Sequence, residues 1–134
     1  MGRPGKKPEE SSQEDKELYR ELVRQASDGI HVLNERGDVV YCSNSFAVLL
    51  GYSFEEALRL NVRDWDRHFP EDQLVPHIKE VMHEPRVFET KHLRKDGEIL
   101  DVQINARGIE LGGRLYLYAS SRDITERQIG RAHV

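Results

Sequence analysis

Residues 94–106 read Arg-Lys-Asp-Gly-Glu-Ile-Leu-Asp-Val-Gln-Ile-Asn-Ala and carry the clearest strand pattern in the chain. Apolar residues at 100, 102, 104 and 106 alternate with polar residues at 101, 103 and 105. A period of two is typical of a β-strand with one buried face. The preceding Asp96-Gly97 pair favours a tight turn, so this strand is predicted to pair with one over residues 87–94.

The same pattern continues toward the C-terminus. Gly112-Gly113 predicts another turn, and residues 115–121 form a further apolar and aromatic strand. Three strands joined by short turns indicate an antiparallel meander. Residues 123–127 then leave the sheet and start a helix, because Asp123 and Thr125 have side chains that can hydrogen-bond the backbone at such a junction.

The first half of the chain begins with two shorter strands. Residues 30–33 and 39–42 flank a turn that contains glycine, which predicts a hairpin. Ser43 or Asn44 then caps a helix, and Gly51 ends it.

Short helical segments lie between this hairpin and the meander. Ser53 and Glu56 have the spacing of a capping box and predict a short helix. Residues 61–65 predict a further helical turn. A longer helix is expected over residues 70–82, with Pro85 just beyond its end.

The N-terminal region divides into a polar segment and an amphipathic one. Residues 1–14 contain almost no apolar side chains, so we expect a disordered tail or a remnant of protein expression. Leu18, Leu22 and Ala26 recur at helical spacing and predict an amphipathic helix over about residues 14–26. This apolar stripe is a candidate homodimer contact, or a cover for the back of its own sheet.

Composition narrows the class of protein. The chain has 134 residues, 37% of them hydrophobic and 33% charged, as expected for one soluble domain. A net charge of −4 does not favour nucleic acid as a partner. Cys42 is the only cysteine and cannot form an internal disulfide, so a reducing, cytoplasmic compartment is expected. No apolar run is long enough to span a bilayer, and none resembles a signal peptide.

The order of elements is therefore helix, two strands, several short helices, three strands and an exit helix. This order predicts an α+β fold with one five-stranded antiparallel sheet, short helices on one face and an N-terminal amphipathic helix.

Five stretches resemble the PAS domain, or sensory box, family in their order and spacing. They are Ala-Ser-Asp-Gly-Ile at 26–30, Val-Tyr-Cys-Ser-Asn-Ser-Phe at 40–46, Leu-Gly-Tyr-Ser-Phe-Glu-Glu at 50–56, Arg-Lys-Asp-Gly at 94–97 and Arg-Asp-Ile-Thr-Glu-Arg at 122–127. The resemblance implies a PAS domain over residues 15–127. Residues 128–134 would begin a linker to an output domain outside this chain.

The resemblance also implies a function. A PAS-like module would bind a small ligand or a partner and would relay a change through Asp123, Ile124 and Thr125. The output domain would be a histidine kinase of a two-component system or a diguanylate cyclase. The predicted pocket lies between the sheet and the helices, lined by Trp65, His77, Met82, Phe88, Ile104, Tyr116 and Tyr118.

Few residues of this sequence match the positions that bind cofactors in the family. Flavin-binding relatives use a reactive cysteine in a stretch that corresponds to residues 61–65, which contain none. Cys42 is expected to be a small buried side chain. Haem-binding relatives use a histidine on the long helix, so His77 or His83 would be the candidate axial ligand.

Two further functions were weighed against the sensor. A homodimerisation module with a filled core would contain no cavity large enough for a ligand. A small α+β enzyme, such as an isomerase, would need a titratable pair inside a cavity, with Asp64, His68 and His77 as candidates. No catalytic residues and no metal site are predicted, since the acidic residues around Trp65 are more typical of a solvated loop.

Overall fold

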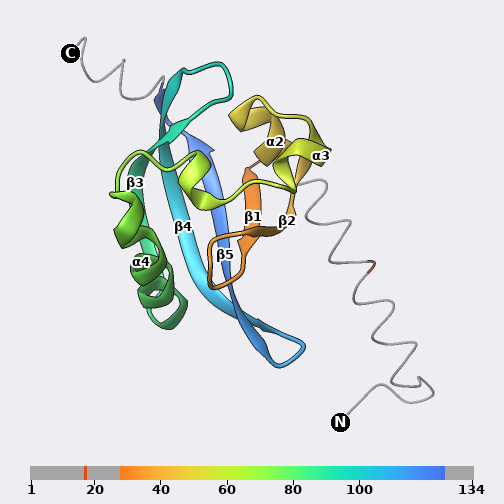
Figure 1. The fold of residues 1–134 in the computed structure, drawn as a ribbon, viewed down its shortest axis with the longest axis vertical. Helices are drawn as coiled ribbons and strands as arrows, with labels where there is room; N and C mark the ends of the chain where they lie inside the picture. The colour runs from red at the N-terminus through yellow and green to blue at the C-terminus, as the bar shows by residue number, and fades with distance from the viewer. Residues whose placement is uncertain (1–16, 18–27, 126–134) are drawn as a thin grey trace.

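The computed structural model describes Glu17 and residues 28–125. Within this range the chain forms one antiparallel sheet and a small group of helices (Figure 1). The strands are β1 (Gly29–Leu33), β2 (Val39–Cys42), β3 (Arg86–Leu93), β4 (Ile99–Leu111) and β5 (Arg114–Asp123). The helices are α2 (Asn44–Leu50), α3 (Phe54–Ala57), the 3-10 turn η1 (Val62–Asp64) and α4 (Glu71–His83).

The five strands belong to a single sheet in the order β2-β1-β5-β4-β3. Every neighbouring pair is antiparallel, and β5 lies in the middle between β1 and β4. This arrangement confirms the predicted five-stranded sheet. The last strand of the chain therefore joins the N-terminal hairpin to the C-terminal meander.

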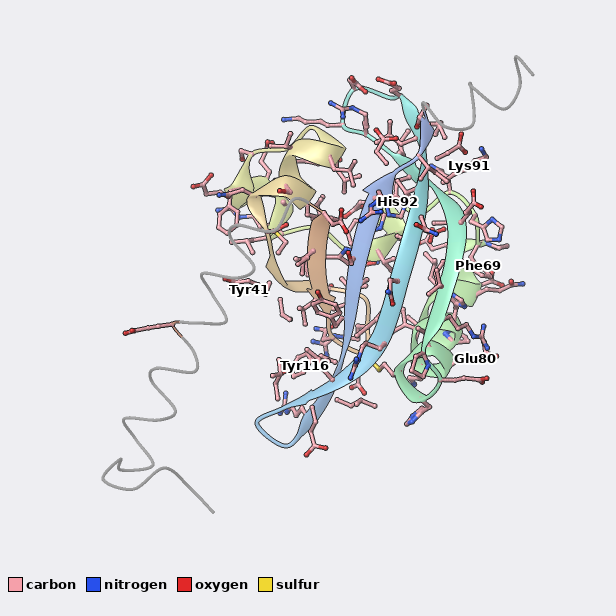
Figure 2. The ribbon with its side chains drawn as sticks, turned by 180° about the vertical axis from the view of Figure 1, so that it is seen from behind. Tyr41, Phe69, Glu80, Lys91, His92 and Tyr116 are labelled. Atoms are coloured by element: carbon pink, nitrogen blue, oxygen red, sulfur yellow. The ribbon has the colours of Figure 1, made fainter. Side chains whose placement is uncertain are left out.

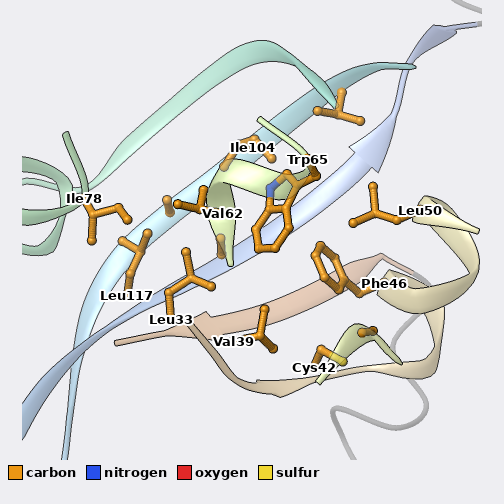
Figure 3. Packing of buried hydrophobic residues seen from close by; sticks show 14 of the residues in the cluster. Leu33, Val39, Cys42, Phe46, Leu50, Val62, Trp65, Ile78, Ile104 and Leu117 are labelled. Atoms are coloured by element: carbon orange, nitrogen blue, oxygen red, sulfur yellow. The ribbon is translucent and has the colours of Figure 1, made fainter. Parts of the chain in front are cut away.

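All the described helices cover the same face of the sheet (Figure 1). Helix α2 packs on β1, while α4 packs on β4 and β5 at the other side. Trp65, just after η1, lies between these two parts of the core (Figure 3). The helices and the inner face of the sheet thus enclose one continuous hydrophobic core.

The helical boundaries follow from local capping. Ser43 caps α2 and Ser53 forms the predicted capping box with Glu56. Gly51 ends α2 with a φ of 80°, a left-handed conformation that glycine adopts without a steric cost. These signals act over a few residues, which is why the sequence locates them well.

Strands β4 and β5 extend beyond their predicted bounds of 100–106 and 115–121. Their pairing continues to Leu111 opposite Arg114. The final residues of β4 and the first of β5 are largely exposed, because this part of the hairpin projects beyond the helices (Figure 1). Because neither face of this part of the hairpin is buried, apolar and polar residues need not alternate along it.

Helix α4 lies very close to β4 at one point. A Cβ atom on Gly108 would lie 2.1 Å from the carbonyl oxygen of Met82, which is inside contact distance. Glycine at position 108 therefore permits the approach of the helix to the sheet.

Two sequence predictions lie outside the described residues. Apart from Glu17, the predicted amphipathic helix with Leu18, Leu22 and Ala26 is not described, and neither is the chain after Thr125. Across the described residues, no helix has both the length and the apolar character needed to cross a membrane.

Candidate ligand cavity and exit segment

A small cavity of about 40 Å³ lies inside the domain, between the inner face of the sheet, η1 and α4. Its apolar wall comes from all these elements, and polar side chains from β1 and β3 interrupt it. The lining residues are His31, Leu33, Val62, Trp65, Asp66, Leu74, His77, Ile78, Val81, Phe88, Thr90, His92, Ile104, Ala106 and Leu117.

Four of the lining side chains have a buried polar atom without a partner among the described residues: His77, through Nε2, and three residues that are almost fully buried. His31, Thr90 and His92 are 4%, 5% and 2% exposed. His31 Nδ1, Thr90 Oγ1 and both ring nitrogens of His92 have no hydrogen-bond partner within the described part of the chain. Each such group costs about 1–3 kcal/mol when it stays unpaired, so a cluster of them requires an explanation.

The sheet positions these three side chains. Thr90 and His92 are two residues apart on β3 and therefore share the inner face, while Lys91 between them points outward (Figure 2). His31 lies on β1 opposite Ala119 of β5. The cluster is therefore fixed on rigid strands rather than on loops.

The indole of Trp65 lies between the two histidines. Its ring centroid is 5.3 Å from that of His31 and 6.2 Å from that of His92, both in edge-on geometry. Phe46 packs against both His31 and Trp65, with ring centroids 4.5 and 5.2 Å away. These aromatic rings limit the rotation of the His31 imidazole.

Burial keeps both imidazoles neutral. It lowers the pKa of His31 to about 3, and the nearby His92 acts in the same direction. Burial also lowers the pKa of His92, against smaller opposing contributions from the backbone of Lys91 and the carboxylate of Asp66. Neither ring nitrogen of His92 forms a hydrogen bond with the Lys91 backbone.

A second hollow adjoins the cavity at its outer side. This surface groove of about 360 Å³ shares His77 and Phe88 with the cavity. The imidazole of His77 stacks on Phe69 with centroids 4.1 Å apart, and Phe88 meets its edge at 5.7 Å. His77 and Phe88 therefore form the boundary between the cavity and this groove.

The structure brings together four of the seven residues predicted to line a pocket. Trp65, His77, Phe88 and Ile104 line the cavity. Met82 and Tyr116 instead line an open groove of about 770 Å³ near the β4–β5 turn. Tyr118 lies on the opposite face of β5, since its neighbours Leu117 and Ala119 belong to the core.

Sequence reasoning missed the polar part of the cavity, which is formed by His31, Thr90 and His92. A signal was present on β3, where Glu89 and Lys91 alternate with Thr90 and His92. No comparable signal marks His31, because all five residues of β1 are buried.

The surroundings of Cys42 and His77 do not favour the binding of a flavin or a haem. Cys42 is buried on β2, and burial raises the pKa of its thiol to about 11, so the reactive thiolate is suppressed. A cavity of about 40 Å³ holds roughly three water molecules and does not accommodate a haem or a flavin ring beside His77.

The candidates for an enzyme or a metal site are dispersed. Asp64 and His68 are exposed, and only His77 of the three enzyme candidates reaches the cavity. Among the described residues, no group of three or more histidine, cysteine or acidic side chains could hold a metal ion.

The three residues predicted to relay a signal form an exit segment at the end of β5. The backbone N–H of Ile124 donates to the carbonyl of Asp101 on β4 at 2.9 Å. The Thr125 hydroxyl accepts from the N–H of Asp101 at 3.1 Å, and Asp123 Oδ1 accepts from the N–H of Thr125 at 2.9 Å. Ile124 is buried, so the exit segment is held to β4 by its backbone and by its side chains.

The start of the described domain lies beside this exit segment. The carboxylate of Asp28, just before β1, pairs with Arg122 at 3.3 Å and accepts from the Ser120 hydroxyl at 3.3 Å. The strands that enter and leave the sheet are thus tied together at one end.

Comparison with known proteins assigns the family. A family profile described as PAS domain matches residues 27–126. The chain belongs to the PAS domain family. PAS domains are sensory domains of signalling proteins, and the exit segment of this PAS domain coincides with the end of the match.

Relatives of this PAS domain include a named sensor. The methyl sulfide methyltransferase-associated sensor of Methanosarcina acetivorans is 26% identical over an alignment of 126 residues that covers 86% of this chain. The chain spans only 12% of the length of that sensor.

Solved structures show the same fold. The PAS domain of an HTR-like protein from Haloarcula marismortui is 26% identical, with a TM-score of 0.76 over 87% of this chain and 97% of the other. A PAS domain from a two-component sensor histidine kinase gives a TM-score of 0.69 at 19% identity, over 84% of this chain and 98% of the other.

Proposed function

We propose that this PAS domain binds a small ligand in its internal cavity and relays the change through the exit segment to an output domain. One observation carries the proposal. Strand β5 contributes Leu117 to the cavity wall and then ends, six residues later, at Asp123 of the exit segment.

Strand β5 is suited to carry such a change. It is hydrogen-bonded to β1 and to β4 along its length, and His31 on β1 pairs with Ala119 of β5. A ligand that moves His31 would therefore shift the backbone of the central strand. Packed elements respond in discrete steps rather than by continuous deformation, so the shift can reach the exit segment.

The output domain belongs to the same proposal. We assign an output of the histidine kinase or diguanylate cyclase type to the parent protein, in a cytoplasmic setting. The presence of a PAS domain in a two-component sensor histidine kinase supports the first type. We assign no catalysis to the PAS domain itself.

Hydrogen exchange of the exit segment tests the relay. Ligand binding should change the exchange rate of the Ile124 and Thr125 amides, which depend on Asp101 and Asp123. Thr125→Val, which removes the hydroxyl bond to Asp101, should uncouple these amides from the cavity while leaving ligand binding intact. Unchanged exchange at saturating ligand would show that the relay is absent.

The parent protein offers a second test. Asp123→Ala removes the acceptor that holds the Thr125 amide, so regulated output should be lost while the basal output remains. Glu110→Ala on the exposed part of β4 is a matched carboxylate control and should leave regulation unchanged.

A homodimerisation module with a filled core is the alternative function, and the small volume of the cavity favours it. Its predicted contact through Leu18, Leu22 and Ala26 stays a prediction. Light scattering of wild-type protein and of Leu22→Glu distinguishes the two functions. A dimer that Leu22→Glu dissociates, together with a cavity that no small molecule enters, would favour the alternative.

A further inference from the structure

We infer that the ligand of this cavity is a small neutral molecule of about three heavy atoms that both donates and accepts hydrogen bonds, held by His31, Thr90 and His92. This inference rests on the proposed ligand-binding function and names the chemistry of its ligand. The geometry of the unpaired polar atoms carries it.

His92 sets the strictest requirement. Both of its ring nitrogens are unpaired within the described part of the chain. A neutral imidazole has one N–H donor and one lone-pair acceptor. An anion that only accepts would leave the acceptor nitrogen unpaired, and a cation that only donates would leave the N–H unpaired. The contents of the cavity, a ligand together with any water beside it, must therefore provide groups of both kinds.

The other two polar side chains extend this pattern. Thr90 Oγ1 can donate one hydrogen bond and accept others, and His31 Nδ1 needs one partner. Thr90 and His92 lie two residues apart on one face of β3, and His31 faces the same cavity from β1. A planar group such as an amide presents a donor and an acceptor side by side in this way.

Charge in the cavity wall agrees with a neutral ligand. Asp66 is the only acidic residue in the lining, which contains no lysine or arginine. Its Oδ1 accepts from the backbone N–H groups of His68 and Phe69 at 2.9 and 3.1 Å, which fixes the carboxylate beside the cavity. Burial lowers the pKa of all three lining imidazoles, those of His31, His77 and His92, so an anion entering the cavity would meet the Asp66 side chain and no lysine or arginine.

The volume limits the size and the affinity of the ligand. About 40 Å³ accommodates roughly three water molecules, which is the space of about three heavy atoms. A ligand of this size binds with a dissociation constant of about 0.5 mM at best. The domain is therefore suited to a metabolite that is present at millimolar concentration.

A matched pair of probes tests this inference. Formamide and formate have the same number of heavy atoms, but only formamide is neutral and carries both donor and acceptor groups. NMR spectra of the His31 and His92 imidazoles should shift saturably with formamide, with a midpoint in the millimolar range. Formate and methylammonium at the same concentrations should leave these resonances unchanged.

Two variants locate the binding. Thr90→Val removes one partner at nearly constant shape and should weaken formamide binding at least threefold. Ser121→Ala is the matched control, because Ser121 Oγ is also buried and unpaired but does not line the cavity. The affinity of Ser121→Ala for formamide should equal that of the wild type.

Several outcomes would overturn the inference. They are equal binding of formate and formamide, no saturable shift with any probe, or equal weakening by Thr90→Val and Ser121→Ala. Amide exchange of Ile124 in the same samples separates this inference from the relay. Formamide binding without a change at Ile124 would refute the relay alone, whereas a change caused only by formate would refute the ligand class alone.

Discussion

Two buried hydroxyl groups on opposite sides of the core have opposite environments. Ser43, beside α2, is 1% exposed, and its oxygen accepts hydrogen bonds from the amides of Ile30 at 2.9 Å and Phe46 at 3.2 Å. Thr90, beside α4, is 5% exposed, and its oxygen has no partner within the described residues. The Ser43 hydroxyl on the α2 side is fully bonded, whereas the Thr90 hydroxyl on the α4 side is available for a ligand.

The difference teaches which polar groups serve the fold. A buried polar group that is fully bonded stabilises the native structure, and its removal exposes unpaired partners. A buried polar group without a partner lowers the stability of the fold unless water or a ligand pairs with it, so its presence requires an explanation. The comparison can be tested by substitutions on both sides of the core.

The largest effect is expected at Phe46, which is 0% exposed on the α2 side. Phe46→Ala should lower the free energy of unfolding by about 3–5 kcal/mol, because it removes a fully packed ring. Phe88→Ala at the rim of the cavity should cost less, since its ring is only partly buried. Urea denaturation followed by circular dichroism measures both. Equal losses would show that the two sides are packed alike.

The next effect concerns acid and the histidines of the cavity. The pKa of His31 is lowered to about 3, so the unfolded state binds more protons than the native state between this value and about 6.5. Stability should therefore fall as the pH falls from 6.5 to 4.5, by about 1.4 kcal/mol per pH unit for one histidine. His92 acts in the same direction.

Denaturation at several pH values measures this slope. Glu56, with a pKa lowered to about 2, contributes only below pH 4.5, so the window isolates the histidines. His31→Leu should flatten the slope. A slope unchanged by this substitution would mean that His31 is protonated in the native state at no cost.

A smaller loss is expected at the bonded hydroxyl. Ser43→Ala should lower the free energy of unfolding by about 2 kcal/mol, because it removes the side-chain cap of α2 and leaves the amide of Ile30 unpaired. The amide of Phe46 keeps its bond to the backbone carbonyl of residue 43 at 3.2 Å. Ser53→Ala, at the exposed cap of α3, is a matched control and should cost about 1 kcal/mol. Thermal or urea denaturation gives both values.

The smallest effect is expected at the unpaired hydroxyl. Thr90→Val should leave the free energy of unfolding unchanged or raise it slightly, because the hydroxyl has no partner to lose. The same variant weakens the binding of formamide as described above. A loss of stability as large as that of Ser43→Ala would show that Thr90 has a structural role, and the contrast between the two sides would fail.

The sequence predicted features that depend on near neighbours. The cap bonds of Ser43, Gly51 and Ser53 reach residues at most four positions away, and the structure places all three as helix caps or ends. The five strands were also found, because the inner face of the sheet needs apolar residues at alternate positions. The outer ends of β4 and β5 were not found, because exposure there removes that requirement.

Only some of the residues that line the cavity were predicted from the sequence. Trp65, Phe88 and Ile104 were found because large apolar residues near the sheet are expected to face the core. His31 and His92 were missed because a buried polar side chain looks, in the sequence, like an exposed one. His31 and His92 line the same cavity because β5 lies between β1 and β4, and no local sequence pattern predicts this strand order.

The central position of β5 has a consequence for how the chain acquires its structure. Strands β1 and β2 form one hairpin and β3 and β4 another, and only β5 bonds the two together. During synthesis on a ribosome, the sheet stays in two pieces until residues 114–123 have emerged from the exit tunnel. Pairing Gly29 with Ser121 also closes a loop of most of the domain, which is a slow step in folding. Nascent chains that stop before Arg114 would therefore expose two unjoined sheet edges to chaperones.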